Sequence, residues 1–245
     1  MKIFLVGFSL LLGMTSLQAD KLRLTSGPEK TSLLELYTSE GCSSCPPAEA
    51  QLSRLKDSPG LWKQFVPIAY HVDYWNRLGW PDRFSSAEWT ARQRRYASLW
   101  RSDSVYTPAF VLDGKEMRGG LGEIPSPHGT AGVLSATSDD GKVWKINFQP
   151  AGRSAGEWEV HLAQLGAGIS SHISAGENGG RTLTHDFVVL AQQNAPLQVD
   201  GDHATARLTI APASETAPRR ALAIWVTRRG ALAPVQATGG WLAAK

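Results

Sequence analysis

The chain of 245 residues contains only two cysteines, Cys42 and Cys45, separated by two serines. A short apolar run at 32–37 precedes them, and Pro46 and Pro47 follow them. Proline is favoured in the first turn of a helix, because the N–H groups of that turn have no intrahelical acceptor. The pattern therefore predicts a buried strand that turns into a helix at the cysteines.

The following 80 residues predict a further strand, a helix and a hairpin. Residues 65–72 read as a second strand, and Ser85 with Glu88 matches a capping box at the start of a helix that reaches about residue 100. Asp113–Gly114 predicts the turn of a β-hairpin. We interpret the arginines of the helix as a solvated face rather than a binding patch; they are Arg92, Arg94, Arg95 and Arg101.

The second half of the chain has a different pattern. Residues up to about 138 predict a loop and a weak terminal helix, and apolar residues alternate at strand spacing from Lys142 onward. Glycine and proline separate these short runs, which is typical of an all-β sandwich. We place the boundary at 137–141.

The order of elements in the first half is that of the thioredoxin fold. We therefore expect an α/β thioredoxin-like domain at 32–138, followed by a smaller all-β, sandwich-like domain at 142–245. Residues 1–19 read as a signal peptide, with Lys2 before an apolar stretch and Ala19 at the cleavage position; an uncleaved anchor is the alternative. Residues 20–31 form a leader.

The predicted export and the small net charge restrict the classes of function that the chain can have. A secreted or periplasmic location is oxidising and permits a disulfide. The formal net charge of +3 is too small to indicate nucleic-acid binding, and we expect no membrane association after signal cleavage.

The cysteine pair suggests redox chemistry. A helix N-terminus stabilises a thiolate, which is the attacking species in disulfide exchange. We expect Cys42 to be the exposed catalytic nucleophile and Cys45 to resolve the mixed disulfide. The alternatives are an inert disulfide and a metal site.

Other residues are candidates for supporting roles. Thr107 and Pro108 precede the hairpin, where a cis-proline opposite the cysteines would shape a substrate-binding surface. His71 or Asp73, at the end of the second strand, is a possible proton relay for Cys45; an ordinary hydrogen-bonded role is the alternative.

Several segments resemble a known family. They are L-Y-T-S-E-G-C-S-S-C-P-P-A, A-Y-H-V-D-Y-W-N-R-L-G-W-P-D-R-F-S-S, R-Q-R-R-Y-A and V-Y-T-P-A-F-V-L-D-G. The chain resembles an uncharacterised family of secreted bacterial proteins, a domain of unknown function similar to the thioredoxin superfamily. The resemblance spans about 33–119 and implies a thioredoxin-like first domain, with Cys42, Cys45 and Pro108 in that superfamily's positions. It implies no particular substrate.

We therefore expect an exported thiol–disulfide oxidoreductase that acts on protein or small thiol substrates, with an unidentified redox partner and no cofactor or resident metal. The alternatives are a non-catalytic binding protein with a permanent disulfide and a copper(I) chaperone.

The segment Gly176–Asp186 is a polar interruption of the β-rich half. It predicts either a solvated hairpin or a hairpin that faces the first domain and helps to form a groove near Cys42. His185 and Asp186 are adjacent strand residues that point to opposite faces, so one metal site could hardly use both.

Overall fold

The computed structural model of the protein describes residues 21–126, 128–152 and 156–243, and the predicted signal peptide at 1–19 lies outside them. Within these ranges the chain forms fourteen β-strands, two α-helices and two short 3₁₀ helices. No helix in the described ranges has the length and hydropathy needed to cross a membrane.

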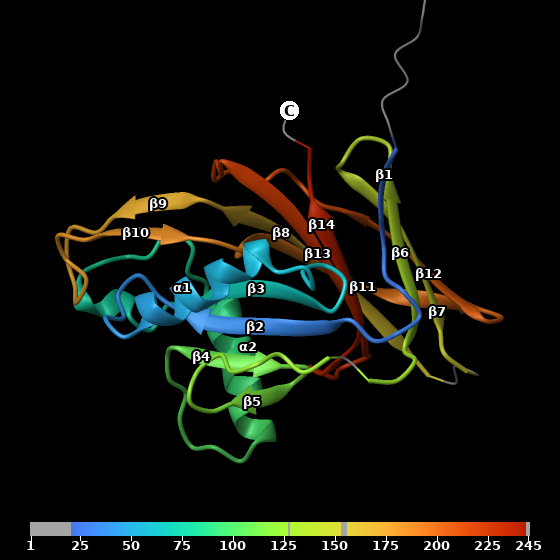
Figure 1. Ribbon diagram of the computed structural model, residues 1–245, viewed down its shortest axis with the longest axis horizontal. Coiled ribbons are helices and arrows are strands. Elements are labelled where there is room, and N and C mark those ends of the chain that lie inside the picture. Colours follow the sequence, from blue (N-terminus) through green and yellow to red (C-terminus); the bar gives the residue numbers. More distant parts are fainter. Residues whose placement is uncertain (1–20, 127, 153–155, 244–245) are drawn as a thin grey trace, which may run out of the picture.

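The elements of the first half are β1 (Leu22–Thr25), β2 (Ser32–Thr38), α1 (Cys45–Arg54), η1 (Leu55–Asp57), β3 (Phe65–His71), η2 (Asn76–Leu78), α2 (Ala87–Leu99), β4 (Ala109–Leu112), β5 (Lys115–Met117) and β6 (Gly132–Ser138). Those of the second half are β7 (Val143–Pro150), β8 (Trp158–Ala167), β9 (Ile169–His172), β10 (Thr182–His185), β11 (Val188–Asp200), β12 (His203–Thr209), β13 (Arg219–Arg228) and β14 (Pro234–Trp241). Figure 1 shows both helices in the left half of the view together with β2 to β5 and the hairpin of β9 and β10, whereas β1, β6, β7 and β12 lie on the right.

Strand β11 connects the two halves of the chain. At its start Val188 pairs in parallel with Ala69 of β3, its middle pairs with β8, and its last residues pair with β12. On the other side of β3, β2 pairs in parallel, and β4 and β5 follow in antiparallel. Twelve strands therefore belong to one mixed sheet, and β9 and β10 form a separate hairpin.

The predicted fold class is wrong. The protein is mainly β-structure, and one mixed sheet runs through both halves, instead of an α/β thioredoxin-like domain followed by a smaller all-β sandwich. The physical reason is the free edge of β3: β11, more than a hundred residues later, occupies it and brings β8, β13 and β14 with it.

Two hydrophobic cores lie on opposite faces of the same strands. On β13, Ala223 and Trp225 belong to the core that contains β2, β3 and both helices, whereas Ile224 belongs to the core against β6, β7 and β12. On β8, Ala163 likewise belongs to the first of these cores and Leu162 to the second. Successive side chains of a strand point to opposite faces, so β8 and β13 are buried on both.

A charged pair lies inside the first core. The Arg92 guanidinium of α2 donates to Glu35 of β2 from Nε at 2.7 Å and from Nη2 at 3.1 Å. The Tyr96 hydroxyl donates to the same carboxylate at 2.6 Å. The expectation of a solvated Arg92 is therefore wrong, because Glu35 requires a buried partner; Arg94 and Arg95 are exposed as expected.

Two local predictions also need correction. The predicted weak helix before residue 138 is strand β6. It pairs with β1 and β7, and the sequence of this segment alone does not indicate these pairings. Helix α2 is capped by Ser86, whose side chain accepts from the N–H of Glu88, one residue later than the predicted cap at Ser85.

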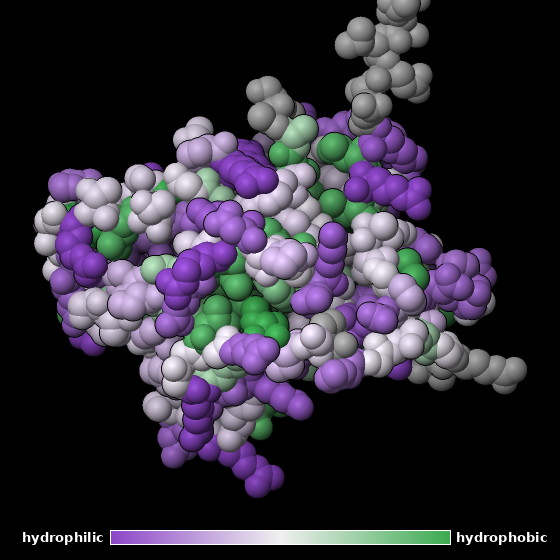
Figure 2. Space-filling view, viewed as in Figure 1, coloured by the Kyte–Doolittle hydropathy of each residue, from purple (hydrophilic) through white to green (hydrophobic). Residues whose placement is uncertain are grey.

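One face of the molecule is mostly polar (Figure 2). Figure 2 shows the face that carries α1 and β2, where hydrophilic residues dominate and a smaller hydrophobic area lies near the middle. Leu99, at the end of α2, is 67% exposed, and Tyr106, immediately before Thr107, is 45% exposed.

Candidate functional site

Cys42 and Cys45 form a disulfide at the junction between β2 and α1. Their Cα atoms are 5.4 Å apart, and the backbone N–H of Cys45 donates to the carbonyl of Cys42 at 3.2 Å. Helix α1 begins at Cys45 with Ser44 as its N-cap and the prolines in its first turn. The predicted strand, cysteine turn and helix are confirmed.

Both cysteines are fully buried, each with 0% of its surface exposed. The prediction of an exposed Cys42 is therefore wrong, whereas Ser43 and Ser44 between them are exposed. Cys42 precedes the helix and is covered by segments that approach from elsewhere in the chain. Access to the sulfurs requires that part of this cover moves.

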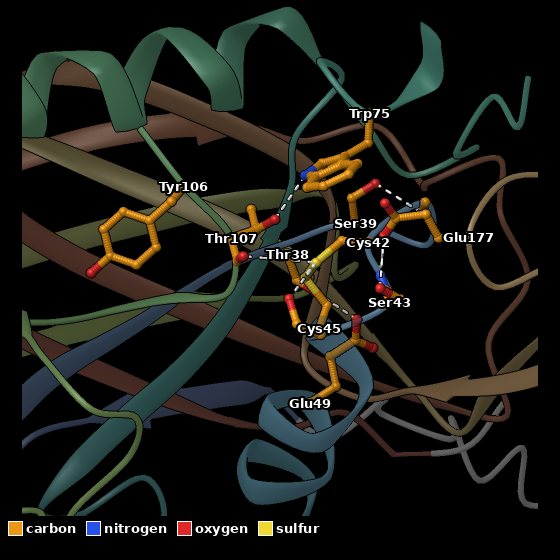
Figure 3. Close-up of a disulfide and its surroundings, with 12 residues drawn as sticks. Thr38, Ser39, Cys42, Ser43, Cys45, Glu49, Trp75, Tyr106, Thr107 and Glu177 are labelled. Atoms are coloured by element: carbon orange, nitrogen blue, oxygen red, sulfur yellow. Dashed lines mark hydrogen bonds between the residues drawn. A yellow bond between two sulfur atoms is a disulfide. The ribbon is translucent and has the colours of Figure 1, made fainter. Parts of the chain in front are cut away.

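Thr107 is one part of the cover. Its carbonyl oxygen lies 3.8 Å from Cys42 Sγ, and its hydroxyl accepts a 2.7 Å hydrogen bond from the Trp75 indole (Figure 3). The Thr107–Pro108 peptide bond is cis, which confirms the predicted conformation. Contact with a substrate at these two residues stays a prediction.

The hairpin of β9 and β10 is the second part. Asn178, in the turn between its strands, is fully buried and donates from Nδ2 to the carbonyls of Glu40 and Cys42, both at 2.9 Å. Glu177 Oε2 accepts from the backbone N–H of Ser43 at 2.9 Å and from its hydroxyl at 2.7 Å (Figure 3). The hairpin therefore faces the cysteines, as one of the two sequence interpretations predicts, and it covers them.

Behind the disulfide lies a cluster of buried ionisable side chains, which we call the acid–histidine cluster. It consists of Glu40, Glu49, His71, Asp82 and His185. His71 Nδ1 lies 2.7 Å from Asp82 Oδ2, and His185 Nδ1 lies 2.5 Å from Glu49 Oε2. His185 Nε2 is 3.2 Å from Glu40 Oε1, and the two imidazole ring centroids are 5.2 Å apart.

The protonation of this cluster follows from its contacts. Burial lowers the pKa of His185, but hydrogen bonds to Glu40 and Glu49 outweigh it and raise this pKa to about 10. Burial raises the pKa of Glu40, and its hydrogen bonds, first that to His185, bring it below the usual value. The pKa of Asp82 is also lowered: burial raises it, and the charge of His71 outweighs that effect.

The two predicted relay residues lie in different surroundings. His71 belongs to the acid–histidine cluster, whereas Asp73 accepts a 2.6 Å hydrogen bond from the Thr90 hydroxyl of α2. Their role as a proton relay stays a prediction.

Sequence reasoning anticipated both parts of the cover and His71, but it gave no role to Glu49 or Asp82 and did not bring His185 together with them. Glu49 follows Cys45 by four residues, and that helical spacing is the one local signal that connects it to the cysteines. Nothing local connects Asp82, Asn178 or His185 to them. Asp186 turns away from His185 as expected and pairs with Lys56 at 2.7 Å.

Fold and site together define a mixed β-sheet protein with a buried disulfide at a strand-to-helix junction, covered by a hairpin. The chain belongs to the family described as "Protein of unknown function (DUF1223)", whose model matches residues 33–227. A search of curated proteins found no match.

Two solved structures are similar. One is the crystal structure of a structural-genomics target from Agrobacterium tumefaciens, with 26% identity and a TM-score of 0.60, covering 87% of this chain and 95% of that one. The other is HBP35 of Porphyromonas gingivalis, with 13% identity and a TM-score of 0.57, covering 89% of this chain and 76% of that one. The second likeness concerns the fold alone.

Proposed function

We propose that the protein is an exported thiol–disulfide oxidoreductase whose reacting group is the Cys42–Cys45 pair. The observation that carries the proposal is the surroundings of Cys42 Sγ, which lies 3.4 Å from the Ser44 hydroxyl and 3.8 Å from the Thr107 carbonyl, just before α1 begins. The Ser44 hydroxyl is free to rotate and donate to a thiolate, and the positive end of the α1 dipole favours negative charge.

The exchange has two steps. A thiolate of the substrate attacks Cys42 Sγ, the Cys42–Cys45 bond breaks, and Cys45 leaves as a thiolate that takes up a proton. A second substrate thiol loses its proton and attacks the substrate sulfur of the mixed disulfide, so that Cys42 leaves as a thiolate and takes up a proton. The oxidised substrate is released, and the cysteine pair has gained two electrons in total. With a substrate disulfide and the reduced protein, the same steps run in reverse.

Movement of the hairpin controls access in this proposal. Because both sulfurs are buried, a substrate reaches Cys42 only when the contacts of Glu177 and Asn178 with the cysteine turn are broken. Among the described residues the hairpin pairs with no strand of the large sheet, so its opening would break no ladder of that sheet. Substrates are exported proteins or small thiols, and the predicted signal peptide supports a secreted or periplasmic location.

The full burial of both cysteines favours a second candidate function, that of a binding protein with a permanent disulfide. In that case the hairpin protects the bond rather than regulating it. The two candidates differ in whether the pair forms a mixed disulfide.

Trapping of that intermediate tests the proposed function. In a Cys45→Ser variant, Cys42 is the only cysteine of the chain, so a mixed disulfide with an exported protein or with glutathione cannot be resolved and accumulates. We expect mass spectrometry to detect such adducts, and to detect fewer of them on Cys45 in the matched Cys42→Ser variant. Two folded variants that both lack adducts would support the permanent disulfide instead.

A further inference from the structure

The acid–histidine cluster brings together potential metal ligands from three separate elements. Glu49 lies on α1, His71 at the end of β3, and His185 at the end of β10. One ligand atom from each lies within 4.8 Å of the others, and all three residues are buried. Glu40, between β2 and α1, lies against His185.

One buried nitrogen of the cluster has no partner. Among the described residues, His71 Nε2 is buried without a hydrogen-bond partner, whereas His185 Nε2 and Glu40 Oε1 lie 3.2 Å from one another. His71 as a residue is 1% exposed. A buried polar atom without a partner is destabilising, so the unpartnered Nε2 of His71 calls for a ligand.

The His71 imidazole is oriented by a carboxylate on its other nitrogen. His71 Nδ1 lies against Asp82, so Nε2 is the nitrogen that neutral His71 can offer to a metal when Nδ1 donates to Asp82, and Asp82 itself accepts backbone N–H groups from Glu40 and Phe84 at 2.9 Å each. This order of carboxylate, histidine and free nitrogen is typical of metal-binding histidines.

The charges of the cluster also leave room for a cation. It contains the three carboxyl groups of Glu40, Glu49 and Asp82, but only two imidazoles, so even two protonated histidines leave one negative charge when the carboxyls are ionised. Buried charges are stable when they are paired or bind a metal ion.

We propose that Glu49, His71 and His185 bind a divalent first-row transition ion of the Zn²⁺ type, with Glu40 available as a further oxygen ligand. Imidazole nitrogen and carboxylate oxygen suit Zn²⁺, at metal–ligand distances of about 2.0–2.2 Å. Two ligands of one ion then lie at most about 4.4 Å apart, and the three ligand atoms already lie within 4.8 Å of one another, so at most a small approach of the side chains is needed. His71 is then a ligand and not a proton relay.

The metal would fix the hairpin over the disulfide. His185 belongs to the hairpin, whereas Glu49 lies on α1 and His71 ends β3, so one ion joins the cover to the elements beneath it. This inference is independent of the proposed exchange reaction, because it requires no thiol.

The test uses the chain without an affinity tag, with its disulfide intact, so that thiols cannot bind the metal. We expect calorimetry with Zn²⁺ to give one ion per chain, and Co²⁺ at the same site to give visible absorption bands. Binding also raises Tm, because Zn²⁺ stabilises only the folded chain. Absence of stoichiometric Zn²⁺ binding by the oxidised native chain would overturn the proposal.

Variants identify the ligands. Loss of a residue that only hydrogen-bonds to a metal ligand weakens metal binding by roughly 10- to 100-fold. We expect His71→Gln and Glu49→Gln, which remove ligands themselves, each to weaken Zn²⁺ binding by more than that. The matched control is His161→Gln, which changes a buried histidine on β8 whose Nδ1 also lacks a partner but which lies outside the cluster. Unchanged binding in both folded ligand variants, or equal loss in the control, contradicts the assignment.

Discussion

Glu177 Oε2 accepts hydrogen bonds from both the backbone N–H and the hydroxyl of Ser43, a residue 134 positions earlier in the chain. These bonds hold the pKa of the Glu177 carboxyl below its usual value, so the carboxylate accepts both donors at neutral pH. The contact joins the hairpin to the turn between the two cysteines. It is the outermost part of the cover over the disulfide.

Removal of this contact should expose the disulfide. We expect Glu177→Ala to increase the rate at which dithiothreitol reduces the Cys42–Cys45 bond several-fold, because the open hairpin becomes more populated. The rate is measured by alkylating the released thiols and determining the mass. Glu157→Gln is the control, since Glu157 forms an exposed pair with Arg229 away from the cysteines. Equal rates in all three proteins would contradict a covering role.

Asn178 should contribute more to stability than its place in a turn suggests. Asn178→Ala leaves the carbonyls of Glu40 and Cys42 without their donor in a buried place, which we expect to cost about 2–3 kcal/mol of unfolding free energy. Urea denaturation of the native and variant proteins measures this change in unfolding free energy. Asn194→Ala, on an exposed part of β11, should change stability by less than about 0.5 kcal/mol. A similar small effect at Asn178 would contradict the contacts described.

The buried pair of Glu35 and Arg92 should behave as a coupled unit. Arg92→Met leaves the Glu35 carboxylate buried without its cation, which we expect to cost about 3–5 kcal/mol. Adding Glu35→Gln removes that charge and should restore part of the loss. Denaturant titration of both single variants and the double variant gives the coupling energy, and strictly additive effects would show that the pair is not coupled.

His161 should make the protein less stable in acid. Burial, together with the charges of Arg92 and Arg95, lowers its pKa from 6.5 to about 3. Between these values the unfolded chain takes up a proton and the folded chain does not, so stability falls as pH drops from about 6.5 toward 3.

Replacement of His161 isolates this effect. We expect His161→Gln, which can still bond to Thr227, to reduce the slope of unfolding free energy against pH by up to about 1.4 kcal/mol per pH unit over this range. Parallel curves for the native and variant proteins would mean that His161 titrates equally in both states.

Local features were predictable from the sequence, and long-range ones were not. The prolines after Cys45 predicted the start of α1, and Asp113–Gly114 predicted the turn between β4 and β5, because these signals act between neighbouring residues. The sequence of β3 cannot show that its edge receives β11 at Val188. For this reason the sequence did not predict that both halves of the chain share one mixed sheet.

The same limit applies to the site. Cys42 and Cys45 were identified because their spacing is local, whereas the burial of Cys42 depends on Asn178, a residue 136 positions away. His185 meets Glu49 across the same distance in sequence, 136 positions. Sequence periodicity locates such residues on their own strands but does not show which partners they meet.

The reduction potential of the Cys42–Cys45 pair tests the proposed function most directly. The protein is equilibrated in thiol–disulfide buffers of graded potential, and the oxidised fraction is determined by alkylation and mass spectrometry. We predict a potential above about −300 mV, with a mixed disulfide detectable at intermediate potentials. A potential below about −300 mV without any mixed disulfide would contradict exchange and identify the bond as a permanent structural one.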